Sequence, residues 1–297
     1  MSEAALSAIP LAASDAELET PSRRALRRLL GRKGAVAGLV VITMFIVLAL
    51  FAPLIAPYDP IATSWTLVRK PPSALHWFGT DDLGRDILAR VIYGARASLL
   101  AGAISVGIAL TIGVPLGLLS GYRGGWADAL ISRITDAMLA CPFLILAIAL
   151  AAFLGPSLGN AMIAIGISAT PIFIRLTRGQ VMSVKVEDYV EAARAVGNPP
   201  RRIALVHILP NIMPALLVQA TLSIAAAIIA EAALSFLGLG QQPPSPSWGS
   251  MLNAAQRFRT RPGWRSGRDL PSFWWCCRSI SWATDCAMRS IRADASA

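Results

Sequence analysis

Long apolar runs separated by polar segments dominate the chain. The runs lie at about 35–55, 98–120, 135–154, 160–176 and 211–237. About 20 helical residues, rising 1.5 Å each, cross the ~30 Å hydrocarbon core of a bilayer, so runs of this length predict membrane-spanning helices. The pattern therefore predicts an all-α fold, a polytopic transmembrane helical bundle with five spans in this chain.

The composition agrees with a membrane protein. Hydrophobic residues make up 55% of the 297 residues and charged residues only 15%, whereas soluble domains carry about 25% charged residues. The formal net charge of +10 comes mostly from arginine. In a membrane protein such charge sets topology and attracts anionic lipid, so we expect the lipid bilayer as a partner and no nucleic acid.

The distribution of Lys and Arg predicts the orientation. Fourteen of them lie before the first run, after the second and after the fourth, which a five-span topology places on one side. Five lie between residues 56 and 97, on the other side. By the positive-inside rule the N-terminus and the stretch 178–210 are cytoplasmic. The first run is too long for a signal-peptide core, so it predicts an uncleaved span.

The charged stretch after the fourth run reads "VEDYVEAARAVGNPPRRIALVHILPN". Tyr189, Val190, Ala193 and Val196 recur at helical spacing, Gly197 suits a left-handed helix end, and a Pro pair follows. Ile203, Val206 and His207 form one face of the next helix. The pattern predicts helix, tight turn, helix. A solvated connector is the alternative, but about thirty amphipathic residues exceed what a connector needs and favour a docking element.

Glycines recur in the second predicted span, at Gly102, Gly107, Gly113 and Gly117. Small residues let helices approach closely in lipid, where the hydrophobic effect does not drive association. Ordinary membrane composition explains the same residues, and the sequence leaves both interpretations open.

Six residues of the charged stretch resemble the EAA signature of ABC-importer permeases: Glu191, Ala192, Ala193, Gly197, Leu209 and Pro210. The form "HILPN" is similar to the branch that imports dipeptides, oligopeptides and nickel. The stretches "HWFGTDDLGRDILARVIYGARASL", "GYRGGWAD" and "EAALSFLGLGQQPPSPSWGSML" match the same branch. The resemblance covers about residues 25 to 258.

The resemblance implies a six-span permease subunit of the bacterial inner membrane, which is not an enzyme and needs no cofactor. Its implied partners are a second permease subunit, two cytoplasmic ATP-binding subunits and a periplasmic or lipid-anchored substrate-binding protein. The family pattern assigns Glu191 to polar contact with the ATPase, Ala193 to close packing and Gly197 to the turn. The sequence itself contains no G-x-x-x-x-G-K-[ST] loop, so the chain must take its energy from another protein.

Two further sets of ionisable residues are candidates. Asp81, Asp82, Arg85 and Asp86 cluster before the second run; they suit a structured periplasmic segment near the substrate-delivery protein, and a catalytic carboxylate or cation site is the alternative. Glu231 lies in the fifth run, where an ionisable residue is a candidate for the transport pathway. Near the interface it could instead be hydrated.

The tail, 259–297, breaks the pattern where the resemblance requires a sixth span. It contains "SFWWCCRSISW" among charged residues, with no C-x-x-C and no nearby His, so we expect no metal site. Codons for apolar residues mostly have T as their middle base. The same DNA read one base late gives codons that begin with T, and these encode Phe, Ser, Trp and Cys among others. Reading the DNA one base upstream reverses this shift. The codons of Trp274 and Trp275 then contain the valine codon GTG, and those of Trp282 and Ala283 contain the glycine codon GGC. We hypothesise a frameshift between about Phe258 and Arg261.

The sequence thus predicts a cytoplasmic N-terminal tail at 1–34, a first span at 35–55, a periplasmic segment at 56–97, a permease core at 98–258 with the loop 185–210, and an aberrant tail. Its function would be the translocation path of an ATP-driven importer of di- or oligopeptides or related solutes. The alternatives are a membrane-embedded enzyme that uses the Asp cluster, and a non-functional truncated permease.

Overall fold

The computed structural model describes residues 33–259, so the predicted N-terminal tail and the hypothesised frameshifted tail lie almost wholly outside the described residues. Within this range every regular element is a helix, and one isolated antiparallel bridge pairs Thr80 with Asp86. The prediction of an all-α bundle is confirmed.

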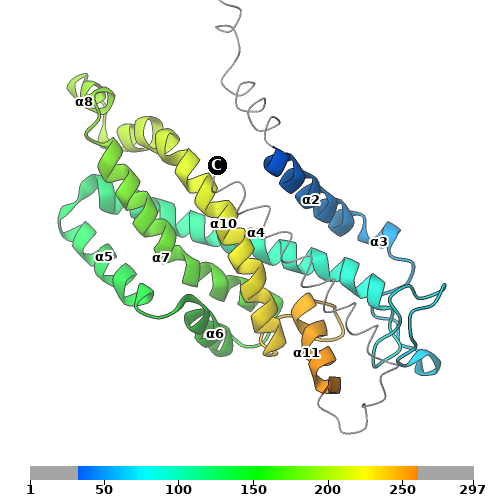
Figure 1. Ribbon diagram of the computed structural model, residues 1–297. Helices are drawn as coiled ribbons and strands as arrows, with labels where there is room; N and C mark the ends of the chain where they lie inside the picture. Colours follow the sequence, from blue (N-terminus) through cyan, green and yellow to red (C-terminus); the bar gives the residue numbers. More distant parts are fainter. Residues whose placement is uncertain (1–32, 260–297) are drawn as a thin grey trace, which may run out of the picture.

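Figure 1 shows the elements. In chain order they are α2 (Lys33–Leu50), α3 (Ala52–Ile55), the 3₁₀ turn η3 (Trp65–Leu67), α4 (Ile87–Arg123), α5 (Gly125–Leu139), α6 (Phe143–Leu154), α7 (Leu158–Val184), α8 (Asp188–Ala195), α9 (Pro200–Arg202), the π-helical η4 (Ile203–Ile208), α10 (Leu209–Phe236) and α11 (Trp248–Arg259).

Three helices in the described range are long and apolar enough to cross a membrane: α4, α7 and the continuous helix Pro200–Phe236. They contain the predicted spans at 98–120 and 160–176 and nearly all of the one at 211–237. The pair α5 and α6 passes the same test jointly, which gives up to four spans. The predicted count of five is therefore confirmed in part, while α2 covers most of the first predicted run.

Two helical segments differ in shape or length from the apolar runs in the sequence. The run at 135–154 is not one straight helix, because α5 and α6 meet at 92°. Pro142 explains the break, since it lacks an N–H and disfavours helical geometry in the residue before it. The helix that contains the second predicted span begins earlier, at Ile87, because the Asp86 carboxylate accepts the backbone N–H of Ala89 and caps α4 there.

The pair α4 and α7 forms the most extensive helix contact of the bundle, and glycines make it close. A Cβ added at Gly113 would lie 2.7 Å from the Phe173 Cβ. One added at Gly117 would lie 2.5 Å from the Thr177 Cβ. At Gly107 such an atom would meet nothing within 4 Å. The close-approach interpretation is therefore confirmed at Gly113 and Gly117, and at Gly102, where the added atom would lie 3.1 Å from Ile224 Cγ2, while at Gly107 no described residue approaches closely.

The bundle has two distinct ends. Figure 1 shows α8 and the turn after it at one end, and α11 with the segment before α4 at the other. We call these the α8 end and the α11 end. Because α4, α7 and α10 run between them, residues far apart in sequence meet at each end.

Candidate functional site

The α8 end contains the predicted helix–turn–helix. Helix α8 spans Asp188–Ala195, and Gly197 has a φ of +84°, the left-handed conformation that glycine adopts without strain. The backbone N–H of Asn198 then donates to the Ala193 carbonyl at 3.3 Å, and α9 begins at Pro200. The geometry predicted for this segment is confirmed.

One side of α8 is built into the bundle. Val190 is fully buried and Ala193 is 8% exposed. Val190 packs in a cluster with Leu118 of α4 and Val181 of α7, together with Ile203, Ile208, Ile212 and Leu216. The short helix is therefore anchored to the ends of the long helices and not carried on a free loop.

The other side of this segment stays uncovered. Glu191 and Ala192 of the predicted signature are exposed, Leu209 is half-buried and Pro210 is exposed. Large apolar side chains accompany them in the same stretch: Val186, Val196, Leu205 and Val206 are each more than half exposed. We call these four the exposed apolar side chains of the segment.

Val196 and Val206 do not share the buried side of Val190 and Ile203, although the helical spacing in the sequence grouped them with these residues. Val196 lies at the C-cap of α8, beyond its last turn. Val206 lies in the π-helical segment Ile203–Ile208, whose wider turn changes the side-chain periodicity. Ile208 consequently takes the buried position in the cluster while Val206 faces outward.

Ionic contacts that the sequence did not reveal support this end. The Arg178 guanidinium of α7 donates twice to Asp128 of α5, from Nε to Oδ1 at 2.6 Å and from Nη2 to Oδ2 at 2.8 Å. Ser120 of α4 donates to the same carboxylate. Arg175, which lies one helical turn earlier, donates to Asp136 at 2.7 Å in an exposed pair. Three helices are thus tied together beneath the helix–turn–helix.

At the α11 end the predicted Asp–Arg cluster is ordered, and its members have different partners. Asp81 Oδ1 accepts the backbone N–H groups of Leu83 and Arg85, both at 2.9 Å, and its Oδ2 accepts Arg85 Nε at 2.7 Å. The buried Arg90 Nε also lies 3.5 Å from that oxygen. Asp81 is therefore the centre of the segment's hydrogen bonds.

Both carboxylate oxygens of Asp86 also have hydrogen-bond partners. Besides capping α4, its Oδ1 lies 2.9 Å from His76 Nδ1, and both side chains are buried. The Tyr58 ring packs on His76 at 4.7 Å between centroids. His76 was not paired with this cluster from sequence, because ten residues separate the two partners. Its contacts fix the segment before α4 onto the start of that helix.

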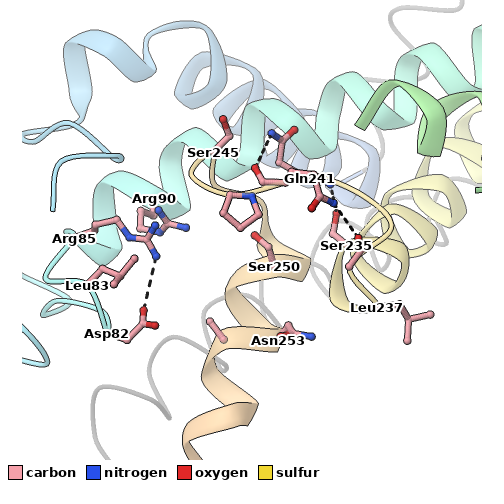
Figure 2. A pocket seen from close by; sticks show the side chains of 14 residues that line it. Asp82, Leu83, Arg85, Arg90, Ser235, Leu237, Gln241, Ser245, Ser250 and Asn253 are labelled. Atoms are coloured by element: carbon pink, nitrogen blue, oxygen red, sulfur yellow. Dashed lines mark hydrogen bonds and ion pairs between the residues drawn. The ribbon is translucent and has the colours of Figure 1, made fainter. Parts of the chain in front are cut away.

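Asp82 differs from Asp81 and Asp86 in its hydrogen bonding. Its Oδ1 is buried and has no hydrogen-bond partner among the described residues, and the nearest cation, Arg85 Nη2, lies 3.8 Å away. It lines a pocket of about 400 Å³ between the segment before α4, the end of α10 and α11 (Figure 2). The part of the chain that the structure describes holds no group of three or more His, Cys, Asp or Glu that would suit a metal ion.

Glu231 is fully buried between helices. Its Oε2 accepts Ser98 Oγ of α4 at 3.1 Å, and its Oε1 accepts Ser235 Oγ, one turn along α10, at 2.7 Å. The interpretation of Glu231 as a hydrated interfacial residue is wrong. Ser235 also lines the pocket, so the Glu231 carboxylate is hydrogen-bonded to a residue of the pocket wall.

Comparison with known proteins agrees with this geometry. The model of the family "Binding-protein-dependent transport system inner membrane component" matches residues 113–283, and that of the "N-terminal TM domain of oligopeptide transport permease C" matches residues 20–72. The inward-facing MetNI methionine ABC transporter has a similar chain, with a TM-score of 0.51 at 19% identity, covering 70% of this chain and 97% of that one. At this low identity, the similarity to the MetNI chain shows a shared fold and nothing more.

Curated relatives are similar over most of their length. A dipeptide transport system permease protein of Alkalihalophilus pseudofirmus is 50% identical, covering 82% of this chain and 81% of the relative. A di/tripeptide permease protein of Pseudomonas aeruginosa is 47% identical, covering 85% and 86%. A glutathione permease protein of Escherichia coli is 44% identical, covering 86% and 84%.

These relatives are transport permeases and not enzymes, which removes the enzymatic interpretation of the Asp cluster. Members of such systems act with an ATPase and a substrate-binding protein. The apolar helices place the chain in the membrane with several crossings. The chain therefore belongs to the family of inner membrane components of binding-protein-dependent transport systems.

Proposed function

We propose that the chain is the permease subunit of an ATP-driven importer of di- or oligopeptides, and that the helix–turn–helix at 185–210 couples it to the ATPase. The observation that carries the coupling role is the two-sided construction of this segment. Val190 is packed into the ends of α4, α7 and α10, while Glu191 and the exposed apolar side chains of the segment are uncovered.

Such a segment suits the transfer of a movement from one protein to another. Apolar side chains that are left exposed next to charged ones are typical of protein-binding surfaces. Because the buried face belongs to the same cluster as the long helices, displacement of α8 would be passed to them through packed contacts. In this proposal Glu191 and Ala192 contact the ATPase, Ala193 keeps α8 close to the bundle, and Gly197 forms the turn.

The proposed substrate class comes from the relatives named for dipeptide and di/tripeptide transport. The proposed assembly pairs this chain with a second permease subunit, two ATPases and an external binding protein. The charge distribution supports a cytoplasmic N-terminus, and with that orientation the α8 end would lie inside the cell and the α11 end outside. Leu209 and Pro210, at the start of α10, link the coupling segment to that helix.

Cysteine cross-linking in membranes of cells that express the whole transporter tests the coupling role. Val196 is 83% exposed, so Val196→Cys should cross-link to the ATPase subunit. Leu217→Cys is the matched control, because Leu217 is 60% exposed on α10, outside the proposed coupling segment, and should form no such product. Equal yields from both variants, or no ATPase product from Val196→Cys, would contradict the proposal.

A further inference from the structure

Most buried apolar side chains of α4, α7 and α10 fall into two separate clusters. One includes Ala109 of α4, Phe173 of α7 and Ala227 of α10, and we call it the α11-side core. The other is the cluster beneath α8, which includes Leu118 of α4 and Leu216 of α10, and we call it the α8-side core. The same three helices therefore pass from one core into the other.

Polar contacts link the helices within each half of the bundle. Near the α11-side core, Ser105 Oγ of α4 donates to the Met162 carbonyl of α7 at 3.0 Å. Near the α8-side core, Lys185 Nζ at the end of α7 donates to the Gly121 carbonyl of α4 at 3.0 Å, and the ion pair between α5 and α7 lies on the same side. Each half of the bundle thus has its own internal links.

Prolines of α4 and α7 lie at the junction of the two cores. A Cβ added at Gly113 of α4 would lie 2.7 Å from the Phe173 Cβ of α7, so these two residues are at the same level of the bundle. Pro115 comes two residues after the first, and Pro171 comes two residues before the second. Two neighbouring helices therefore carry a proline within about one turn of the same level.

The other helices of the bundle have prolines at this junction too. Pro214 of α10 lies between the α8-side core, which Leu216 shares, and the previous turn, while Ala220 is the first residue of α10 in the α11-side core. Helix α5 is bonded to the α8-side half through its ion pair with α7, whereas Ala147 of α6 belongs to the α11-side core. These two helices meet at Pro142 at an angle of 92°.

A proline inside a helix weakens it at a defined turn. Because Pro115 and Pro171 have no N–H, the carbonyls of Thr111 and Ile167, four residues earlier, lose their usual backbone donor. Sharp bends in helices occur mostly at such positions. The junction is therefore the level at which the bundle resists bending least, since several of its helices lack a backbone hydrogen bond there.

We propose that the bundle bends at these prolines, so that its α8-side half pivots as one unit against its α11-side half. The inference rests on the proposed coupling role, because the ATPase acting on α8 supplies the movement. It places the movement inside this chain, whereas a rigid subunit would tilt as a whole against its partners.

The size of the movement follows from the length of helix beyond the junction. Met182 of α7 lies eleven residues after Pro171. At 1.5 Å of rise per residue, a bend of about 20° at the proline would displace Met182 by roughly 6 Å. Residues within one half would keep their mutual distances, because the packed side chains and polar contacts of that half move together.

Distances between spin labels in the whole transporter, reconstituted in lipid nanodiscs, test this proposal. Met182 of the α8-side half and Leu100 and Phe153 of the α11-side half are exposed, so each can carry a label on cysteine in a chain whose own cysteines are replaced by serine. Between the nucleotide-free state and the state trapped with ATP and vanadate, at least one of the two distances from Met182 should change by ~3 Å or more.

Two control pairs lie within single halves. The distance between Leu100 and Phe153, and that between Met182 and the exposed Leu130 of α5, should stay the same in both states. A change in either control pair as large as the change across the junction would overturn the proposal, because the halves would then not be units.

Replacement of the prolines gives the second measurement. The combined variant Pro115→Ala, Pro171→Ala and Pro214→Ala regains three backbone N–H donors, and alanine favours a helix. It should reduce the distance change at Met182 at least twofold, and a melting temperature no lower than that of the parent protein shows that it is folded. Pro57→Ala, in an exposed position outside the helices, should leave the change as it is. A change that persists in full in the combined variant would overturn the role of the prolines.

The experiment separates this inference from the coupling role. If Val196→Cys forms its cross-link to the ATPase while both distances from Met182 stay fixed, the chain moves as a rigid body, and the bending is refuted while the coupling stands. If the cross-link is absent, the coupling itself is refuted, and the source of the movement with it.

Discussion

The close packing of α4 against α7 yields a prediction whose size follows from the structure. In Gly117→Ala the new Cβ would lie 2.5 Å from the Thr177 Cβ and 2.8 Å from the backbone oxygen of Ile174. Carbon atoms in contact normally lie about 3.5–4.0 Å apart. Thr177 is fully buried and a backbone oxygen cannot rotate away, so the two helices must separate by roughly an ångström.

Overpacking of this kind costs about 1–3 kcal/mol. For a chain of this size 1 kcal/mol corresponds to roughly 2–4 °C in Tm. Gly117→Ala should therefore lower the melting temperature of the detergent-solubilised protein by roughly 2–12 °C, measured from the fraction that remains monodisperse in size-exclusion chromatography after heating.

Gly107→Ala is the matched control on the same helix. An alanine there would meet nothing within 4 Å, so no separation of helices is required. Alanine is favoured over glycine in helices by up to about 1 kcal/mol, and the control should melt at the same temperature as the parent protein or slightly above it. Equal melting of the two variants would refute the close-approach explanation.

Two further predictions concern the α8 end and the tail. Arg178→Ala removes two charge-assisted bonds from partly buried Asp128 and should cost about 1–2 kcal/mol in the same melting assay; Arg175→Ala breaks a pair whose side chains are 66% and 58% exposed and should cost under ~1 kcal/mol. A reversed order would contradict the assigned roles. If the tail is frameshifted, the gene read one base upstream from about Phe258 should encode an apolar run of span length, and the corrected chain should restore peptide uptake; a stop codon in that frame would contradict this.

The apolar periodicity was sufficient to predict the long helices, because each needs about 20 consecutive apolar residues to cross lipid. It was not sufficient for the broken helix at 135–154. The 92° bend follows from Pro142 at the junction, yet Pro115 and Pro171 lie inside helices that continue. Whether a proline ends a helix depends on what neighbouring helices supply to the freed backbone groups, and that is a tertiary property.

The helix–turn–helix was predictable because its signals are local: a glycine at the left-handed position and a proline at the next helix start. The ion pair between Asp128 and Arg178 was not predictable, since fifty residues separate the partners in sequence. The Asp cluster shows the same limit at short range. Asp81, Asp82 and Asp86 look alike in sequence, and only the folded segment gives hydrogen bonds to the first and the last and an ion pair with Arg85 to the middle one.

The two ends of the molecule share their helices, which connects the proposed coupling segment to the α11 end. Leu118 of α4 and Leu216 of α10 belong to the cluster beneath α8. Ser98 of α4 and Glu231 of α10 bond to each other next to the pocket. A change in the angle between α4 and α10 that starts at α8 and extends beyond the prolines would therefore have to break or rebuild the Ser98–Glu231 bond. Under the proposed coupling, Glu231 would affect transport without touching the solute, because its hydrogen bond to Ser98 would oppose that change at the α11 end.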